Sequence, residues 1–236
     1  MTALWYALAA AAANVVGAAA VTWRAAWSVR TLEWVIALSA GFMVSVAMLD
    51  MLPHAYAAGG ATAAAVALGG FLAVHLTQHT LATHFHFGEE THSVSHAVGF
   101  SALVGLLLHT IVDGVAIASA TRVSAAMGAL VFLAITLHKL PEGLAIASLF
   151  LAAGATRARA FAAALMLGAA TVLGAVITPL VPLLATWGLA LSAGVTLYVG
   201  ASNLVPEFQA KRRWGLQAGF FVGVALYAAT RMLVGE

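Results

Sequence analysis

Long apolar runs separated by short polar stretches dominate this chain. Runs of about 20 residues recur at about 2–22, 33–57, 60–82, 97–119, 125–152, 160–184, 189–208 and 216–234. A helix needs about 20 consecutive apolar residues to cross a hydrocarbon core of about 30 Å. The pattern therefore predicts an all-α polytopic membrane protein whose eight transmembrane helices form a single domain, residues 1–236.

The one sizeable polar connection between these runs is residues 83–96. It contains four histidines and follows two more at the end of the preceding run, the six being His84, His86, His92, His96, His75 and His79. Histidine-rich tracts often bind metal ions. A solvated loop explains the same residues equally well, so both interpretations stay open.

The composition excludes a soluble domain, a nucleic-acid partner and thiolate metal ligands. Hydrophobic residues make up 63% of the chain and charged residues 8%, whereas a soluble domain has about 25% charged residues. The net charge of +2 comes from a few residues at helix ends, which indicates membrane topology rather than a nucleic-acid partner. Because the chain has no cysteine, a metal site has to use nitrogen, oxygen or thioether ligands.

The basic residues predict the orientation. If both termini are external, seven of the ten lysines and arginines fall in cytoplasmic loops, namely Arg24, Arg30, Arg157, Arg159, Lys211, Arg212 and Arg213. Cytoplasmic loops carry such an excess. We therefore expect a multi-pass protein of the inner (plasma) membrane with external termini and a cytoplasmic 83–96 loop.

Two segments of nearly identical sequence carry the candidate chemistry. Each reads His-x-x-x-carboxylate-Gly-apolar-Ala-Ile-Ala-Ser, with His109 and Asp113 in the first segment and His138 and Glu142 in the second. Residues four apart lie on the same face of a helix. An ionisable group at membrane depth is costly and is usually paired or functional. Protonation or pairing with Lys139 would explain the acids alone, but the repeated histidines favour one divalent-cation site built from both segments.

The ligand types narrow the choice of ion. Imidazole and carboxylate without thiolate favour Zn²⁺, Fe²⁺, Mn²⁺, Co²⁺ or Cd²⁺ over Ca²⁺ and Mg²⁺, which prefer all-oxygen shells. The sequence does not choose among the five.

Prolines within the apolar runs mark further polar groups. Pro53, Pro141 and Pro206 each bend a helix and free the carbonyl oxygen of the residue four positions earlier. Candidate pathway residues near the first and third of these prolines are Met43, Asp50, His54, Asn203 and Glu207. Snorkelling to the interface explains His54 and Glu207 equally well, and core packing is the favoured role of Met43.

These features resemble a bacterial member of the ZIP family of zinc and iron transporters, and the resemblance covers the whole chain. The paired signatures carry it, together with the eight-helix count, the external termini and the 83–96 loop. It implies inverted three-helix repeats around the central fourth and fifth helices, and an elevator-like or related alternating-access movement of metal into the cytoplasm. It also implies that the four motif residues form the principal site, with Met43 contributing from the second helix and Asn203 standing where many members carry an acid.

Three positions depart from the family pattern, and at one of them Asp113 stands in place of the commoner Glu. Members with a two-ion site often have Asn after the first motif histidine and an acid after the second, where this chain has Thr110 and Lys139. An ammonium beside a second ion would repel it, and its flexible stem can instead reach Asp113 or Glu142. We therefore predict a single ion, with Lys139 as a tethered cation in place of the second metal.

The residues thus predict a divalent transition-metal transporter, and the resemblance favours Zn²⁺ as its ion and import as its direction. The metal ion is its substrate, the bilayer is its other partner, and no cofactor is expected. The alternative is an intramembrane metal-dependent hydrolase, which is weaker because the chain has no His-Glu-x-x-His helix. Gly219-x-x-x-Gly223 is compatible with a homodimer, but the motif is too common in membrane proteins to predict one.

Overall fold

The computed structural model describes residues 1–23, 29–80, 96–209 and 213–234. The helices are α1 (Thr2–Thr22), α2 (Val29–Val46), α3 (Leu52–Thr80), α4 (His96–Val123), α5 (Ala125–Ala152), α6 (Arg157–Ile177), α7 (Pro182–Tyr198), α8 (Val205–Gln209) and α9 (Trp214–Val234), with π-helical turns η1 (Ala47–Met51) and η2 (Val199–Leu204). No strand occurs among these described residues, which confirms the predicted all-α class.

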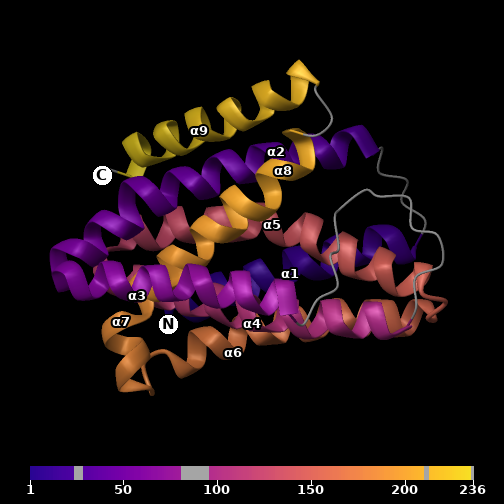
Figure 1. Ribbon diagram of the computed structural model, residues 1–236, viewed down its shortest axis with the longest axis horizontal. Helices are drawn as coiled ribbons and strands as arrows, with labels where there is room; N and C mark the ends of the chain where they lie inside the picture. The colour runs from indigo at the N-terminus through magenta and orange to yellow at the C-terminus, as the bar shows by residue number, and fades with distance from the viewer. Residues whose placement is uncertain (24–28, 81–95, 210–212, 235–236) are drawn as a thin grey trace.

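Within the described ranges, seven helical segments are long and apolar enough to cross a membrane, so the protein is a multi-pass membrane protein. One of the seven, Arg30–Gln78, has 49 residues. At 1.5 Å per residue it would be about 70 Å long if straight, more than twice the hydrocarbon thickness. Gly60, within α3, interrupts it with a positive φ of 54°, and the chain that runs one way along α2 runs back along the labelled part of α3 (Figure 1). The predicted count of eight spans stays a prediction, which this reversal supports.

The helix bounds differ from the predicted ranges where the backbone leaves the regular α-helix. The range predicted as 33–57 is α2, then the turn η1, then the beginning of α3. The range predicted as 189–208 begins earlier, at Pro182, and is interrupted by η2. Hydrophobic periodicity identifies an apolar run, but it does not reveal a wide turn inside the run.

The two π-helical turns share one design. Each turn ends two residues before a proline, η1 before Pro53 and η2 before Pro206. A proline lacks the amide hydrogen that would bond four residues back and its ring crowds that carbonyl, and a widened turn is a common way to accommodate such a defect. The carbonyls that the prolines free, those of Leu49 and Ser202, lie within these turns. This shared design supports the predicted inverted repeat, which stays a prediction.

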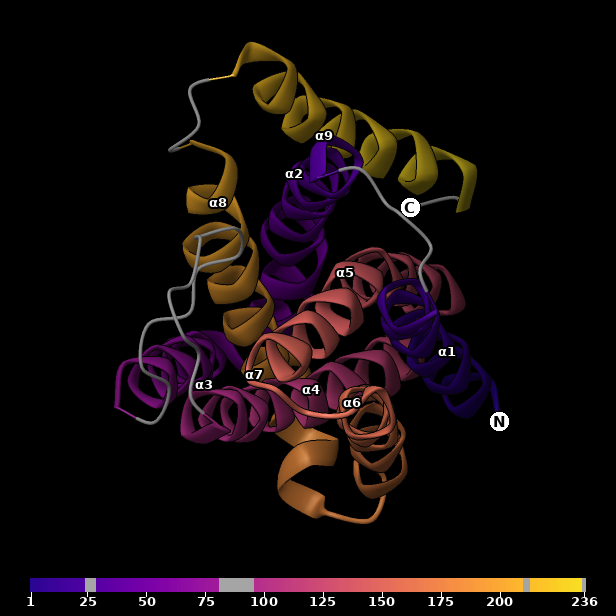
Figure 2. The ribbon, with the colours of Figure 1, turned by 90° about the vertical axis from the view of Figure 1, so that its right-hand side faces the viewer.

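The helices pack in two groups. In the first, α5 packs most extensively on α1, and α4 packs on α6; in the second, α3 packs on α7, and α2 packs on α9. Figure 2 shows α5 and α4 near the middle, between α1 and α6 of the first group and α2, α3 and α8 of the second. The groups meet mainly where α4 contacts α7 and α5 contacts α2. The repeated motif therefore lies on helices at the boundary between the groups.

Helix α9 is held along α2 by glycines and by an ion pair near each end. A Cβ on Gly223 would overlap the Leu38 carbonyl oxygen, and Gly219 faces Ala37 and Trp34, so both glycines of the Gly-x-x-x-Gly motif serve a contact within the chain. The ion pairs join Arg213 to Glu33 and Arg231 to Asp50. Dimerisation is not needed to explain this motif.

Candidate metal site between helices α4 and α5

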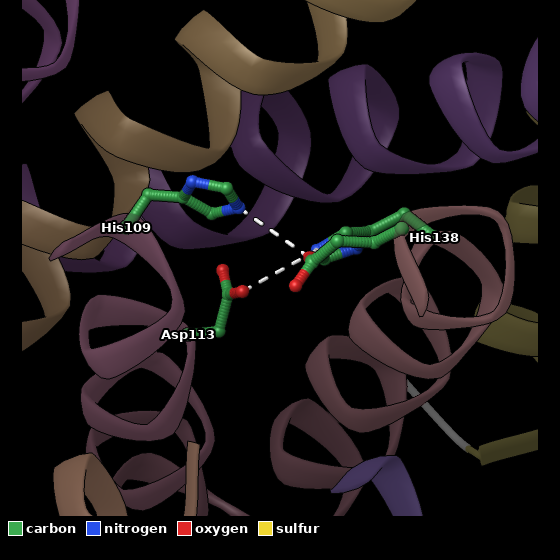
Figure 3. Close-up of side chains that lie close together, drawn as sticks. His109, Asp113 and His138 are labelled. Carbon is green, nitrogen blue, oxygen red and sulfur yellow. Dashed lines mark hydrogen bonds and ion pairs between the residues drawn. The ribbon is translucent and has the colours of Figure 1, made fainter. Parts of the chain in front are cut away.

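The two sequence motifs bring four polar side chains together inside the helix bundle. His109 and Asp113 lie one turn apart on α4, and His138 and Glu142 do so on α5. All four are buried, with at most 4% of each residue exposed. One nitrogen or oxygen atom from each lies within 4.8 Å of the corresponding atoms of the others. Figure 3 shows His109, Asp113 and His138 directed toward one another from two neighbouring helices. We call these four residues the histidine–carboxylate cluster.

The separations within the cluster fit a small four-coordinate ion. His109 Nε2 lies 3.4 Å from Glu142 Oε2, and His138 Nε2 lies 3.4 Å from Asp113 Oδ2 and 3.8 Å from Glu142 Oε2. In a tetrahedral Zn²⁺ site with bonds of about 2.0–2.1 Å, neighbouring ligand atoms are about 3.4 Å apart. These three pairs are therefore close to the spacing that one tetrahedral ion requires.

The ring of His138 is oriented by its own helix. Its Nδ1 lies 3.2 Å from the carbonyl oxygen of Ala134, one turn earlier. Because a carbonyl oxygen only accepts hydrogen bonds, Nδ1 carries the hydrogen and donates it, and Nε2 of the neutral ring keeps its lone pair. Metal-binding histidines are commonly oriented by a hydrogen bond of this kind. His138 Nε2 is thereby available to an ion.

Lys139 is the cation that compensates the two acids in this structure. Its Nζ lies 2.7 Å from Asp113 Oδ2 and 2.8 Å from Glu142 Oε2, and its side chain is fully buried. Nζ also donates to Thr110 Oγ1 at 3.2 Å. The three hydrogens of the ammonium thus have three acceptor groups. The role of Lys139 in place of a second metal ion stays a prediction.

Two neighbours of Glu142 bind its other oxygen. Asn14 Nδ2 and Thr110 Oγ1 each donate to Glu142 Oε1 at 3.2 Å. Asn14 was not among the residues predicted from the sequence, although an amide in the middle of the apolar helix α1 is a detectable signal. Thr110 was considered only as a departure from the family pattern.

The carbonyl freed by Pro141 has a partner from another helix. Pro141 cannot bond to the carbonyl of Leu137, and the hydroxyl of Ser39 on α2 donates to that oxygen at 3.0 Å. The same hydroxyl is 2.7 Å from the Val35 carbonyl oxygen of its own helix. The one hydrogen of Ser39 is therefore shared between the Val35 carbonyl and the proline-freed carbonyl, one residue before His138, and Ser39 was not among the residues predicted from the sequence.

The candidate pathway residues are not gathered at this cluster. The carboxylate of Asp50 is 1% exposed, accepts a hydrogen bond from Tyr227 at 2.6 Å and lies 3.1 Å from Arg231 Nε. Met43 is buried in the apolar core, close to the place that a Cβ on Gly200 would occupy. Asn203 is half-buried within η2. A pathway role for these residues stays a prediction.

His54 lines a cavity of ≈ 330 Å³ between α3, α4 and α7, together with Ser119, Arg122 and Trp187. Its Nδ1 lies 2.8 Å from the Asp50 carbonyl oxygen, one turn earlier. This is the hydrogen bond that His138 makes within its own helix, so His54 Nε2 keeps its lone pair in the same way. The remaining predicted positions are outside the described part of the chain: His84, His86 and His92 in full, and the side chains of His79, His96 and Glu207.

A comparison with known protein families finds a match over the part of the chain that carries the repeated motif. Residues 88–231 match the family model described as ZIP Zinc transporter. The match includes α4 and α5 and therefore the whole histidine–carboxylate cluster. No curated protein matches the chain.

Proposed function

Because the chain belongs to the ZIP zinc transporter family, we propose that it carries a divalent transition-metal ion, Zn²⁺ above all, into the cytoplasm through the histidine–carboxylate cluster. Members of the family are transporters and not enzymes, so the hydrolase alternative falls away. The observation that carries the proposal is the cluster itself. Four buried ligand groups of the types that bind Zn²⁺ lie together at the boundary between two groups of helices.

The packing supports an alternating-access mechanism. The first group (α1, α4, α5, α6) holds all four members of the cluster, and the second group (α2, α3, α7, α8, α9) closes over it through α2 and α7. A relative movement of the two groups would uncover the cluster on one side of the membrane at a time without taking the ligands apart. Transporters commonly move rigid bundles around a fixed site in this way.

The proposed orientation places the 83–96 loop relative to an imported ion. With external termini, the arginines at the start of α6, Arg157 and Arg159, and Arg213 before α9 face the cytoplasm, as the excess of positive charge in cytoplasmic loops requires. The 83–96 loop then lies on the cytoplasmic side in the plasma membrane. It is placed after the cluster on the path of an imported ion, where its histidines would receive or regulate the ion rather than conduct it.

Uptake by reconstituted protein tests the proposal. Wild type and the single alanine variants of His109, Asp113 and Glu142 are reconstituted into liposomes that contain a Zn²⁺-sensitive dye. Each variant should lose most initial uptake, because removing one ligand leaves the remaining buried groups uncompensated. His75→Ala is the matched control, since His75 is exposed and meets Tyr198 edge to face outside the cluster. Near-normal uptake by a correctly inserted cluster variant would refute the site.

The number of ions has its own test. Lys139 Nζ lies within 2.8 Å of both carboxylates, and its positive charge already offsets part of their negative charge, so the two acids have less charge left to balance a second divalent ion. A single ion, held by the cluster, is therefore expected. Anomalous diffraction from Zn²⁺-soaked crystals should show one peak between α4 and α5. Two well-occupied peaks a few ångströms apart, with Lys139 turned away, would refute the single-ion site.

A further inference from the structure

We propose that Asn14 and Thr110 hold the Glu142 carboxylate so that it offers one oxygen to the ion, and that they thereby favour four-coordinate Zn²⁺ over larger six-coordinate ions such as Mn²⁺. The inference rests on the proposed function and concerns the selectivity of the same site. Both are positioning residues that act through Glu142.

The two oxygens of Glu142 have different surroundings. Oε2 faces the cluster, 3.4 Å from His109 Nε2 and 3.8 Å from His138 Nε2. Oε1 instead receives two donors that do not contact Oε2, Asn14 Nδ2 and Thr110 Oγ1, each at 3.2 Å, whereas Lys139 Nζ lies nearer to Oε2, at 2.8 Å, than to Oε1, at 3.1 Å. A carboxylate oxygen has about two lone-pair sites, so Oε1 has none left for a metal ion.

The direction of the Thr110 hydroxyl is fixed by Lys139. Nζ carries only hydrogens to donate, so in its 3.2 Å contact with Thr110 Oγ1 the hydroxyl oxygen is the acceptor. The hydroxyl hydrogen is then free to point to Glu142 Oε1, to which Oγ1 donates at 3.2 Å. Thr110 therefore accepts a hydrogen bond from the Lys139 ammonium and donates one to Glu142 Oε1.

Asn14 approaches Glu142 from a third helix, and the backbone fixes its position. A Cβ on Gly143 would overlap the carbonyl oxygen of Asn14, and a Cβ on Gly17 would overlap the carbonyl oxygen of Leu140, so α1 and α5 are in backbone contact on both sides of this amide. Because a carboxylate only accepts hydrogen bonds, the amide has to present its NH₂ group to it. Asn14 is 0% exposed, which leaves it little freedom to turn away.

The free-energy cost of burying the Asn14 side chain argues against a role in packing alone. Its amide oxygen is buried and has no hydrogen-bond partner among the described residues. An unpartnered buried acceptor costs about 1–3 kcal/mol, and a leucine of nearly the same size would avoid that cost in an apolar helix. The contact with Glu142 is the gain that offsets it.

One oxygen from Glu142 sets the coordination number. With two imidazole nitrogens and one oxygen from Asp113, it gives four ligands, the number that Zn²⁺ usually adopts in proteins. Mn²⁺ is better satisfied by six ligands rich in oxygen, and a chelating carboxylate would add one of these. By occupying Oε1, Asn14 and Thr110 withhold that ligand.

The test compares initial uptake rates of Mn²⁺ and Zn²⁺ in dye-loaded liposomes. Asn14→Leu and Thr110→Val, singly and together, remove the donors with little change in size. We expect the Mn²⁺/Zn²⁺ rate ratio to rise in both single variants and by about tenfold in the double variant, the scale on which such outer partners of a metal site act. Thr110→Ser keeps the hydroxyl and is the matched control, so its ratio should equal that of wild type.

The outcomes separate a failure of this inference from a failure of the proposed function. Equal proportional losses of both ions in the variants would mean that the two residues only support the fold, and the inference would be wrong while the proposed transport survives. Wild type that transports neither ion would overturn the proposed function and the inference with it. X-ray absorption of Zn²⁺ bound to purified wild type needs no variant and should show four nitrogen and oxygen neighbours. A first shell of five or six, with both Glu142 oxygens bound, would overturn the inference directly.

Discussion

Replacing Arg231 should destabilise the protein far more than replacing Arg213, although each arginine pairs with an acid, Asp50 of η1 and Glu33 of α2, respectively. Arg231 lies 3.1 Å from Asp50, whose side chain is 1% exposed, and Arg213 lies 3.1 Å from Glu33, whose side chain is 8% exposed. The arginines themselves are 38% and 62% exposed, respectively. The first pair is therefore shielded from water to a greater degree, and the second is close to a surface ion pair.

These exposures set the expected magnitudes. Removing one partner of a buried ion pair costs about 3–5 kcal/mol, because the other charge is left without compensation. Tyr227 still donates to Asp50 at 2.6 Å, so we expect the lower end, about 3 kcal/mol, for Arg231→Leu. Arg213→Leu should cost about 1 kcal/mol or less, as exposed ion pairs do.

The measurement is the free energy of unfolding in detergent micelles, followed by circular dichroism during a denaturant titration. Asp50→Asn added to Arg231→Leu removes the uncompensated charge and should recover a good part of the loss. Equal losses for the two arginine variants, or a double variant no more stable than Arg231→Leu, would refute this reasoning. Uptake by the double variant also tests Asp50 itself, because a pathway residue would stay essential after stability is restored.

Three further predictions use the same preparations. Ser39→Ala should lower the free energy of unfolding by about 1–3 kcal/mol, because it leaves the Leu137 carbonyl unpaired; Ser45→Ala, at a hydroxyl that bonds only within its own helix, is the comparison. Gly143→Ala should cost about 1–3 kcal/mol or more through overlap with the Asn14 carbonyl, and Zn²⁺ affinity measured by calorimetry should fall with it. Joint replacement of the four loop histidines by serine should leave substantial Zn²⁺ uptake; the four are His84, His86, His92 and His96. Complete loss of uptake at normal expression would mean that the loop lies on the path or that the true topology is the inverse of the predicted one.

The repeated motif made the centre of the protein predictable, because its information is local. A histidine and a carboxylate four residues apart share a helix face whatever the rest of the chain does, and the structure puts both pairs side by side. Lys139 was predictable for the same reason, since it follows His138 directly and needs only its own stem to reach the acids. Metal binding by these residues stays a prediction.

Contacts between distant segments could not be predicted in the same way. Asn14 and Glu142 are 128 positions apart, and nothing in an alanine-rich helix indicates which neighbour its one amide will meet. Ser39 meets Leu137 across 98 positions. The sequence identified the carbonyl that needed a partner but not the helix that provides one. The wide turns were missed for a related reason, because proline predicts a defect without specifying its geometry.

The short connection between α4 and α5 has a consequence for how the protein enters the membrane. Only Ser124 separates Val123 from Ala125, so the two helices form a tight hairpin. A charged side chain in the middle of an inserting helix costs about 2.5–3.5 kcal/mol. Lys139 and Glu142 pair within α5 at 2.8 Å, whereas Asp113 of α4 meets its cation only on α5, at 2.7 Å. Helix α4 is synthesised before α5, so the charge of Asp113 is neutralised only when Lys139 of α5 follows. The hairpin of the two helices is therefore best inserted into the membrane as one unit.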